Sequence, residues 1–194
     1  MKIKYFLMSL LITACSDDRN TISDISENIK NAAIIRTLSF DNSDFIRDEL
    51  DSVFNVNLEV QDGDDGALMT GVDIFVRFKD NTVSENNISS QEVLLKTLDA
   101  DEFINGVMDL PTISLDLLYS ELVTATNIAS NEIACKDQFL IRLKLNLSDG
   151  RSFSNTNNQS SSSSIIAFDT ASSSPFCYTI NITDAIPTDL FLGQ

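Results

Sequence analysis

The stretch QFLIRLKLNL, residues 138–147, constrains the fold more than any other part of the chain. Its side chains alternate, so a β-strand here would carry one apolar and one polar face. The apolar face would consist of Phe139, Ile141, Leu143, Leu145 and Leu147. The opposite face would carry Arg142, Lys144 and Asn146, and the Asp149-Gly150 pair is typical of a turn. The pattern predicts a long strand with one face in a core and the other in water.

Two further segments show the same period of two. Residues 54–60, FNVNLEV, and 72–79, VDIFVRFK, each place four apolar side chains on one face. The segment between them, QDGDDGA, is typical of a turn. We therefore expect these two strands to form a hairpin-like pair.

Weaker strand patterns occur at residues 36–40, 92–98, 163–169 and 177–182. The segment 111–128 differs, because Leu115, Leu118, Leu122 and Ile128 have nearly helical spacing after Pro111, with Ser114 as an N-cap. The sequence predicts an all-β fold over residues 32–182: an immunoglobulin-like β-sandwich of about seven strands with one short inserted helix. The polar stretch 154–164 is expected to form a loop.

Residues 1–14 have the layout of a secretory signal: Lys2 and Lys4 precede a short apolar run that ends in Thr13 and Ala14. The run is shorter than the roughly 20 residues of a membrane-spanning helix. Residues 12–15, ITAC, resemble a bacterial lipobox, which implies that Cys15 is acylated and becomes the first mature residue. A plain signal peptide is the alternative.

Ser16, Asp17 and Asp18 follow the cysteine and resemble the acidic export signal of surface-exposed lipoproteins in Bacteroidota. This resemblance implies an outer-membrane protein that faces the cell exterior, although a short acidic cluster also suits an ordinary linker. Residues 15–31 read as a flexible tether. Residues 183–194 read as a linker, the start of a truncated further segment, or an edge strand.

The net charge is −16, and loss of Lys2 and Lys4 with the leader makes it −18. This charge repels phosphate backbones and excludes nucleic-acid binding. The chain contains no histidine, and therefore no imidazole general base or ligand. If Cys15 carries lipid, Cys135 and Cys177 remain, and we expect a disulfide between them in an oxidising compartment. Two separate thiols are the alternative.

Three groups of carboxylates are candidate sites. Asp62, Asp64 and Asp65 lie among glycines and suit calcium, although Asp and Gly also simply form turns. Asp41 and Asp44 would join such a site only if the fold brought them near. Residues 99–102, with Asp99, Asp101 and Glu102, are a candidate carboxylate pair for glycoside cleavage, which requires two carboxylates on either side of a groove. No residue of the chain indicates a groove around that pair, which argues against the hydrolase. No cofactor is expected, apart from calcium at Asp62, Asp64 and Asp65.

Four segments carry a resemblance to a known family. AAIIRTLSFDNSDF, LEVQDGDDGALMTGVDIFVRFKDNT, CKDQFLIRLKLNLSDGRSFS and SSPFCYTINI resemble small outer-membrane lipoproteins that accompany SusC/SusD-type importers in flavobacteria. The resemblance covers residues 32–182. It implies an immunoglobulin-like, non-enzymatic accessory protein, with a β-barrel transporter and a SusD-like lipoprotein as partners. The alternatives are a surface protein that binds a glycan or other ligand for a neighbouring importer, and a hydrolase that uses Asp or Glu.

Overall fold

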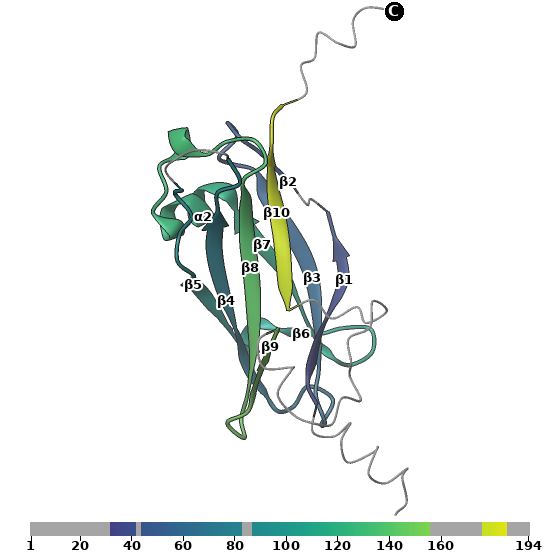
Figure 1. Cartoon of the computed structure of the whole chain (residues 1–194). Coiled ribbons are helices and arrows are strands. Elements are labelled where there is room, and N and C mark those ends of the chain that lie inside the picture. Colours follow the sequence, from purple (N-terminus) through teal and green to yellow (C-terminus); the bar gives the residue numbers. More distant parts are fainter. Residues whose placement is uncertain (1–31, 42–43, 83–86, 156–175, 186–194) are drawn as a thin grey trace, which may run out of the picture.

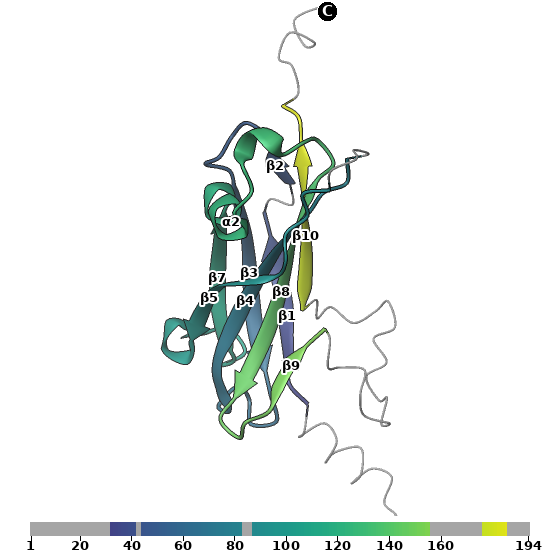
Figure 2. The ribbon, with the colours of Figure 1, turned by 60° about the vertical axis from the view of Figure 1, so that its left-hand side comes forward.

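The computed structural model describes residues 32–41, 44–82, 87–155 and 176–185. Within these residues the strands form two facing sheets, and one short α-helix lies at one end (Figures 1 and 2). The first sheet has the order β1-β3-β7-β6, with strands at Ile34–Phe40, Val53–Gln61, Pro111–Leu118 and Ile104–Asn105.

The second sheet has the order β2-β10-β8-β4-β5, and β9 pairs with β8. These strands span Asp44–Ile46, Cys177–Thr183, Gln138–Leu147, Met69–Lys79, Val93–Asp99 and Ser152–Ser154. The helix α2 spans Tyr119–Thr126, and the 3₁₀ turns η1 and η2 span Ala100–Glu102 and Ser130–Glu132.

The strand order is that of an immunoglobulin domain. The first sheet follows the A-B-E-D order, and the neighbours β10, β8 and β4 of the second follow the G-F-C order. The pairs between strands are antiparallel, apart from the parallel pair of β2 and β10. The prediction of an immunoglobulin-like sandwich with a short helix is confirmed.

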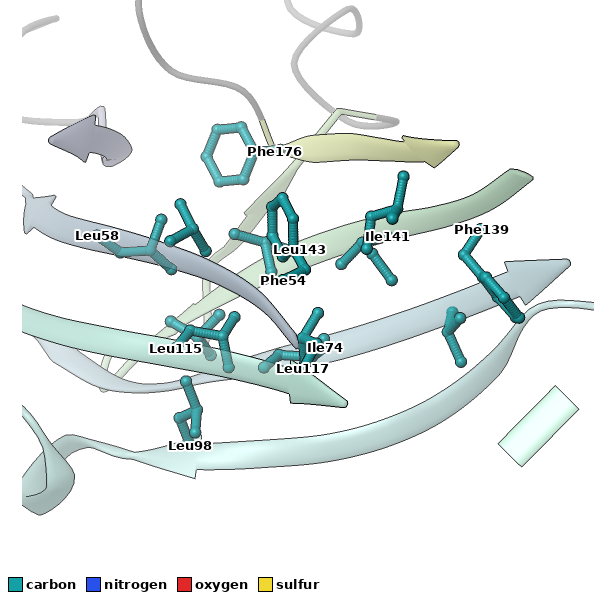
Figure 3. Packing of buried hydrophobic residues seen from close by; sticks show 14 of the residues in the cluster. Phe54, Leu58, Ile74, Leu98, Leu115, Leu117, Phe139, Ile141, Leu143 and Phe176 are labelled. Carbon is teal, nitrogen blue, oxygen red and sulfur yellow. The ribbon is translucent and has the colours of Figure 1, made fainter. Parts of the chain in front are cut away.

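The core lies between the two sheets, as the alternation in the sequence predicts. In β8 every second residue from Phe139 to Leu147 is buried, and the residues between them are partly exposed. Figure 3 shows side chains such as Leu143 and Ile74 of one sheet packed against Leu58 and Leu115 of the other. Full burial of each such side chain stabilises the fold by about 1.5–3 kcal/mol relative to exposure.

The expected pairing of residues 54–60 with 72–79 is wrong. These segments form β3 and β4, which belong to different sheets. β3 pairs with β1 and β7, whereas β4 pairs with β5 and β8. The connection at residues 62–68 therefore crosses from one layer to the other, so that both strands direct their apolar faces into the shared core.

The inserted helix is present but begins later than predicted. Residues up to Leu118 form β7, in which Leu115 and Leu117 are buried on one face, and Ser114 lies in this strand and caps no helix. The helix begins at Tyr119 and ends at Thr126, where Asn127 adopts a left-handed conformation with φ 55°. The apolar positions Leu115 and Leu122 thus belong to two different elements.

The expected disulfide is wrong, because Cys135 and Cys177 are free thiols. Cys177 lies at one end of β10, and Cys135, from the segment before β8, lies beside the other end. Cys177 begins the strand, whereas the residue after Cys135, Lys136, donates its N–H to the Ile182 carbonyl at 2.9 Å. Five residues of strand separate these two places by roughly 17 Å. A disulfide requires its Cα atoms within about 7 Å.

Reduction of the protein is therefore expected to leave its thermal midpoint unchanged. In the native state, Cys177 should react rapidly with a thiol reagent because it is exposed, and the partly buried Cys135 should react more slowly. Thiol titration and thermal scans with and without a reducing agent measure both effects. Loss of free thiol together with a lower midpoint after reduction would contradict the free-thiol arrangement.

An aromatic cluster joins α2 to the core. The Tyr119 ring stacks on Phe45 at 4.9 Å and meets Phe139 edge-on at 5.9 Å. Tyr119 is fully buried, and within the described residues its hydroxyl has no hydrogen-bond partner. Burial raises the pKa of Tyr119 from 10.0 to about 12, because the phenolate would lose its hydration.

This raised pKa predicts a loss of stability in alkali. The folded state holds the Tyr119 proton up to about pH 12, whereas the unfolded chain releases it near 10.0. The stabilisation that comes from keeping Tyr119 neutral is therefore fully present below the unfolded pKa. It is lost as pH rises through the folded pKa, and the free energy of unfolding falls by roughly 2–3 kcal/mol. Urea unfolding on both sides of this interval should show a smaller alkaline loss in Tyr119→Phe than in the wild type.

Tyr178→Phe is the matched control, because the Tyr178 hydroxyl lies 2.7 Å from Thr37 Oγ1. At neutral pH this variant should lose about 1 kcal/mol with its hydrogen bond, whereas Tyr119→Phe should keep or slightly exceed wild-type stability. Equal losses in the two variants would show that the Tyr119 hydroxyl has a partner.

Several predictions fall on residues outside those described. These are the leader at 1–14, Cys15 with Ser16, Asp17 and Asp18, the strand at 163–169, and all but the first two residues of the loop at 154–164. For 183–194, only the first three residues are described, and Thr183 ends β10. Among the described residues, no helix has the length and apolar character required to cross a membrane.

Candidate functional site

Nine large apolar side chains of the described residues are exposed: Leu38, Phe40, Leu50, Val53, Leu94, Ile104, Val107, Met108 and Leu118. Val107 and Met108 lie in the turn between β6 and β7, and Ile104 of β6 lines one groove with Leu38 of β1; we call these four residues the hairpin patch. Val107 is 102 % exposed, and Met108 and Ile104 are 72 % and 71 % exposed. Contiguous exposed apolar residues often mark interaction sites.

The hairpin that joins β6 to β7 supports this patch. Its turn is closed by two backbone hydrogen bonds, from the Gly106 N–H to the Leu110 carbonyl at 2.8 Å and from the Asp109 N–H to the Gly106 carbonyl at 3.1 Å. Asp109 adopts a φ of 57°, which Asp tolerates better than most residues. A Cβ at Gly106 would overlap the Thr112 side chain, so the turn packs closely on its own strand.

A groove of about 530 Å³ lies beside the hairpin on the outer face of the first sheet. Its lining consists of Leu38, Ser39, Asn57, Leu58, Glu102, Ile104, Thr112, Ile113 and Ser114. Polar groups in it bind one another: Asn57 Nδ2 donates to Ser39 Oγ at 2.9 Å, and Thr112 Oγ1 donates to the Ile104 carbonyl at 3.0 Å. The groove thus combines apolar walls with amide and hydroxyl groups that are already oriented.

The region around the hairpin is acidic. The segment 99–109, which runs from the η1 turn into the hairpin, contains four carboxylates and neither Lys nor Arg. Asp109 follows Met108 in the turn, and Glu102 lines the groove. Lys96 lies toward the α2 end instead, where its Nζ donates to the Asp116 carbonyl at 3.0 Å and lies 3.9 Å from Glu121. Carboxylates therefore lie beside the apolar hairpin, and Arg36, the cation on β1 at the level of the hairpin base, is paired with Glu59.

The outer face of the second sheet has a different character. The Arg142 guanidinium lies 4.1 Å from the centre of the Phe75 ring and donates to both carboxylate oxygens of Glu92, at 2.8 and 2.6 Å. These hydrogen bonds lower the pKa of Glu92 and raise that of Arg142. These contacts stabilise the sheet face, and Glu92 occupies the Nε and Nη2 donors of Arg142.

Asp62, a predicted calcium ligand, organises the loop between the sheets. Its buried carboxylate accepts backbone N–H groups from Asp64 at 2.8 Å, Gly66 at 2.9 Å and Leu68 at 3.0 Å. Asp64 and Asp65 point into the exposed part of the loop. In the part of the chain that the structure describes, no three His, Cys, Asp or Glu side chains are grouped to hold a metal ion.

The other carboxylate candidates also have local structural contacts. Asp41 is exposed after β1, and Asp44 accepts a hydrogen bond from Asn181 Nδ2 at 2.9 Å. In the segment 99–102, Glu102 Oε1 accepts the backbone N–H of Asp99 at 2.8 Å and so closes the η1 turn. The structure thus places each group in a turn or at a strand end.

Val107 and Met108 are the site residues that the sequence reasoning did not single out. Their signal is the apolar pair within NGVMD, where a hairpin turn ordinarily carries Gly, Asn, Asp or Ser. An apolar pair in a turn gains nothing for folding unless another surface covers it.

Comparisons with known proteins add little. No protein-family model matches the chain, and no curated protein matches it. Among solved structures, it is similar to MtrC from Shewanella baltica OS185, with 13% sequence identity and a TM-score of 0.37 over 81% of this chain and 23% of that chain. The chain thus spans about a quarter of that structure, and a similarity at this level carries no argument about function.

The fold and the surface together define the class of the protein: an immunoglobulin-like β-sandwich with an apolar hairpin exposed at one end. The register places that hairpin at the end where the chain enters the domain. Ile34 pairs with Gln61 on β3, and Glu59 of the same strand pairs with Thr112 at the base of the hairpin. The helix α2 lies at the opposite end, after Leu118 (Figure 1).

Proposed function

We propose that this chain is a non-enzymatic lipoprotein of the outer-membrane surface, held there by lipid on Cys15. It acts as an accessory subunit of a SusC/SusD-type importer or a related outer-membrane complex. The observation that carries the docking role is the hairpin patch, because Val107 and Met108 are exposed without a role in folding. The lipobox-like ITAC and the family resemblance support the location and the kind of complex.

The position of the hairpin supports the same proposal. The first described residues, 32 and 33, precede β1 at the end where the hairpin patch lies, so the proposed tether at 15–31 would join the domain there. A domain held by this tether would present that end toward the membrane and its resident proteins. The patch would then meet a β-barrel transporter or its SusD-like partner without reorientation of the domain.

Affinity purification tests this function. Full-length protein with a C-terminal tag, extracted from outer membranes in detergent, should bring down a β-barrel transporter and a SusD-like lipoprotein in constant ratio. Cys15→Ala is the matched control, because it removes the lipid and leaves every described residue unchanged. Recovery of the tagged protein alone from the wild-type membranes would contradict the accessory role.

The groove supports a second candidate function, a surface lipoprotein that binds a glycan or another ligand for a neighbouring importer. The observation in its favour is the row of oriented polar groups from Ser39, Asn57, Thr112 and Ser114 beside apolar walls. Calorimetry against a panel of polysaccharides distinguishes the two functions. Heat of binding that disappears in Asn57→Ala would support capture of a glycan, and its absence across the panel would favour docking alone.

A further inference from the structure

The tip of the β6–β7 hairpin carries an inference about the partner itself, which rests on the docking function proposed above. We propose that Val107 and Met108 insert into an apolar pocket of a partner protein, and that Lys and Arg side chains of the partner surround this pocket. The occupant of the hairpin patch is thus a protein surface of basic and apolar character, rather than lipid or a second copy of this acidic chain.

The first step is that the tip has no role within its own fold. Val107 is 102 % exposed and Met108 is 72 % exposed, so neither side chain is covered by the sandwich. The backbone bonds of Gly106, Asp109 and Leu110 close the turn without them. Burial of these two apolar side chains beneath a partner surface would be favourable, because it removes apolar area from water.

The second step is that the hairpin is rigidly mounted. Leu110 is buried at 6 % exposure, and Thr112 Oγ1 holds the Ile104 carbonyl at 3.0 Å across the base. Pro111 packs so closely on Gly66 of the neighbouring loop that a Cβ there would overlap its ring. A preorganised tip loses little conformational entropy on binding. Met108 adds an adaptable side chain of the kind that fills irregular pockets.

The third step is the charge around the tip. Asp109 adjoins Met108, Glu102 lines the groove beside Ile104, and the loop packed on Pro111 exposes Asp64 and Asp65. Anionic lipid headgroups and a second molecule of net charge −16 would both be repelled by these carboxylates. A basic rim around an apolar pocket complements them and speeds association at low salt.

Site-specific photocrosslinking in cells tests this inference. A photoreactive residue is placed at position 107 or 108 of the full-length chain, and at the control position 51, which is exposed at the α2 end. We expect one discrete protein adduct from 107 and 108 and none above background from 51. Mass spectrometry of that adduct should find apolar residues at the crosslink, with Lys or Arg beside them in the partner.

Three results would overturn the inference: adducts with lipid, a crosslinked dimer of this chain, or a protein adduct whose crosslinked surface is acidic. If the partner co-purifies but crosslinks only from position 51, the docking function stands and its assignment to the tip fails. If no partner co-purifies at all, the docking function itself fails. The purification and the crosslinking together therefore separate the two outcomes.

Discussion

Joint replacement of Val107 and Met108 by aspartate is expected to weaken binding to the outer-membrane partner about a thousandfold and to leave the domain folded. Buried apolar anchors at the centre of an interface commonly contribute 2 kcal/mol or more each, and about 1.4 kcal/mol corresponds to a tenfold change in affinity. The added carboxylates would also be desolvated in the partner's pocket. Since both side chains are exposed, the free energy of unfolding should change by no more than about 0.5 kcal/mol.

A double variant, Leu50→Asp with Leu94→Asp, is the matched control. It introduces the same charge at two exposed apolar positions outside the hairpin patch, which are 39 % and 55 % exposed. Titration of the purified partner should give wild-type affinity for this control. Equal losses in the two double variants would show that net charge, rather than the hairpin tip, governs binding.

Asp62→Ala is expected to destabilise the protein by about 3 kcal/mol, with or without calcium. The substitution removes the buried acceptor of three backbone N–H groups, and a hydrogen bond to a charged group contributes about 1.5–3 kcal/mol net. Because the rest of the loop is exposed, water binds some of the freed N–H groups and offsets part of the loss. The loop that joins the two sheets would lose its shape, and with it the packing of Gly66 on Pro111.

Urea unfolding in calcium and in a chelator measures this effect. Asp64→Ala is the control, because the Asp64 side chain is exposed and only its backbone N–H binds Asp62. The control should stay within about 0.5 kcal/mol of the wild type. If calcium stabilises the wild type but not Asp62→Ala, then Asp62 is a metal ligand rather than the organiser of the loop.

The strands were the most predictable part of the fold. An alternation with period two indicates directly which side chains face the core, and the buried residues of β3, β4 and β8 follow it apart from Glu59 and Gly71. The same period says nothing about which strands are neighbours. Both β3 and β4 direct apolar faces into one core from opposite layers, so the sequence pattern alone could not distinguish a hairpin from a crossover between sheets.

The segment 111–126 shows a second limit. Leu115, Leu118 and Leu122 fit a helical spacing, but Leu115 and Leu117 equally fit a strand. Leu115 pairs with Val56 on β3, and this pairing fixes the segment as a strand. The two residues are far apart in the sequence. Only after Leu118 does the helix begin. Where a short apolar run fits both spacings, tertiary contacts determine whether it forms a helix or a strand.

The cysteines and the site show why spatial arrangement was harder to predict. Two cysteines in an exported chain suggest a pair, yet the count does not show that β10 separates them. The hairpin turn could be predicted from NGVMD. The groove that Leu38 and Ile104 line beside it depends on the pairing of β1, β3 and β7, which no local pattern encodes.

The mass of the mature native protein tests the account most directly. Protein purified from outer membranes should begin at Cys15 and carry acyl chains on it, and protease added to intact cells should degrade it. A mature protein that begins at another residue and carries no fatty acid would contradict the membrane anchor. The hairpin patch would then have no membrane partner to meet.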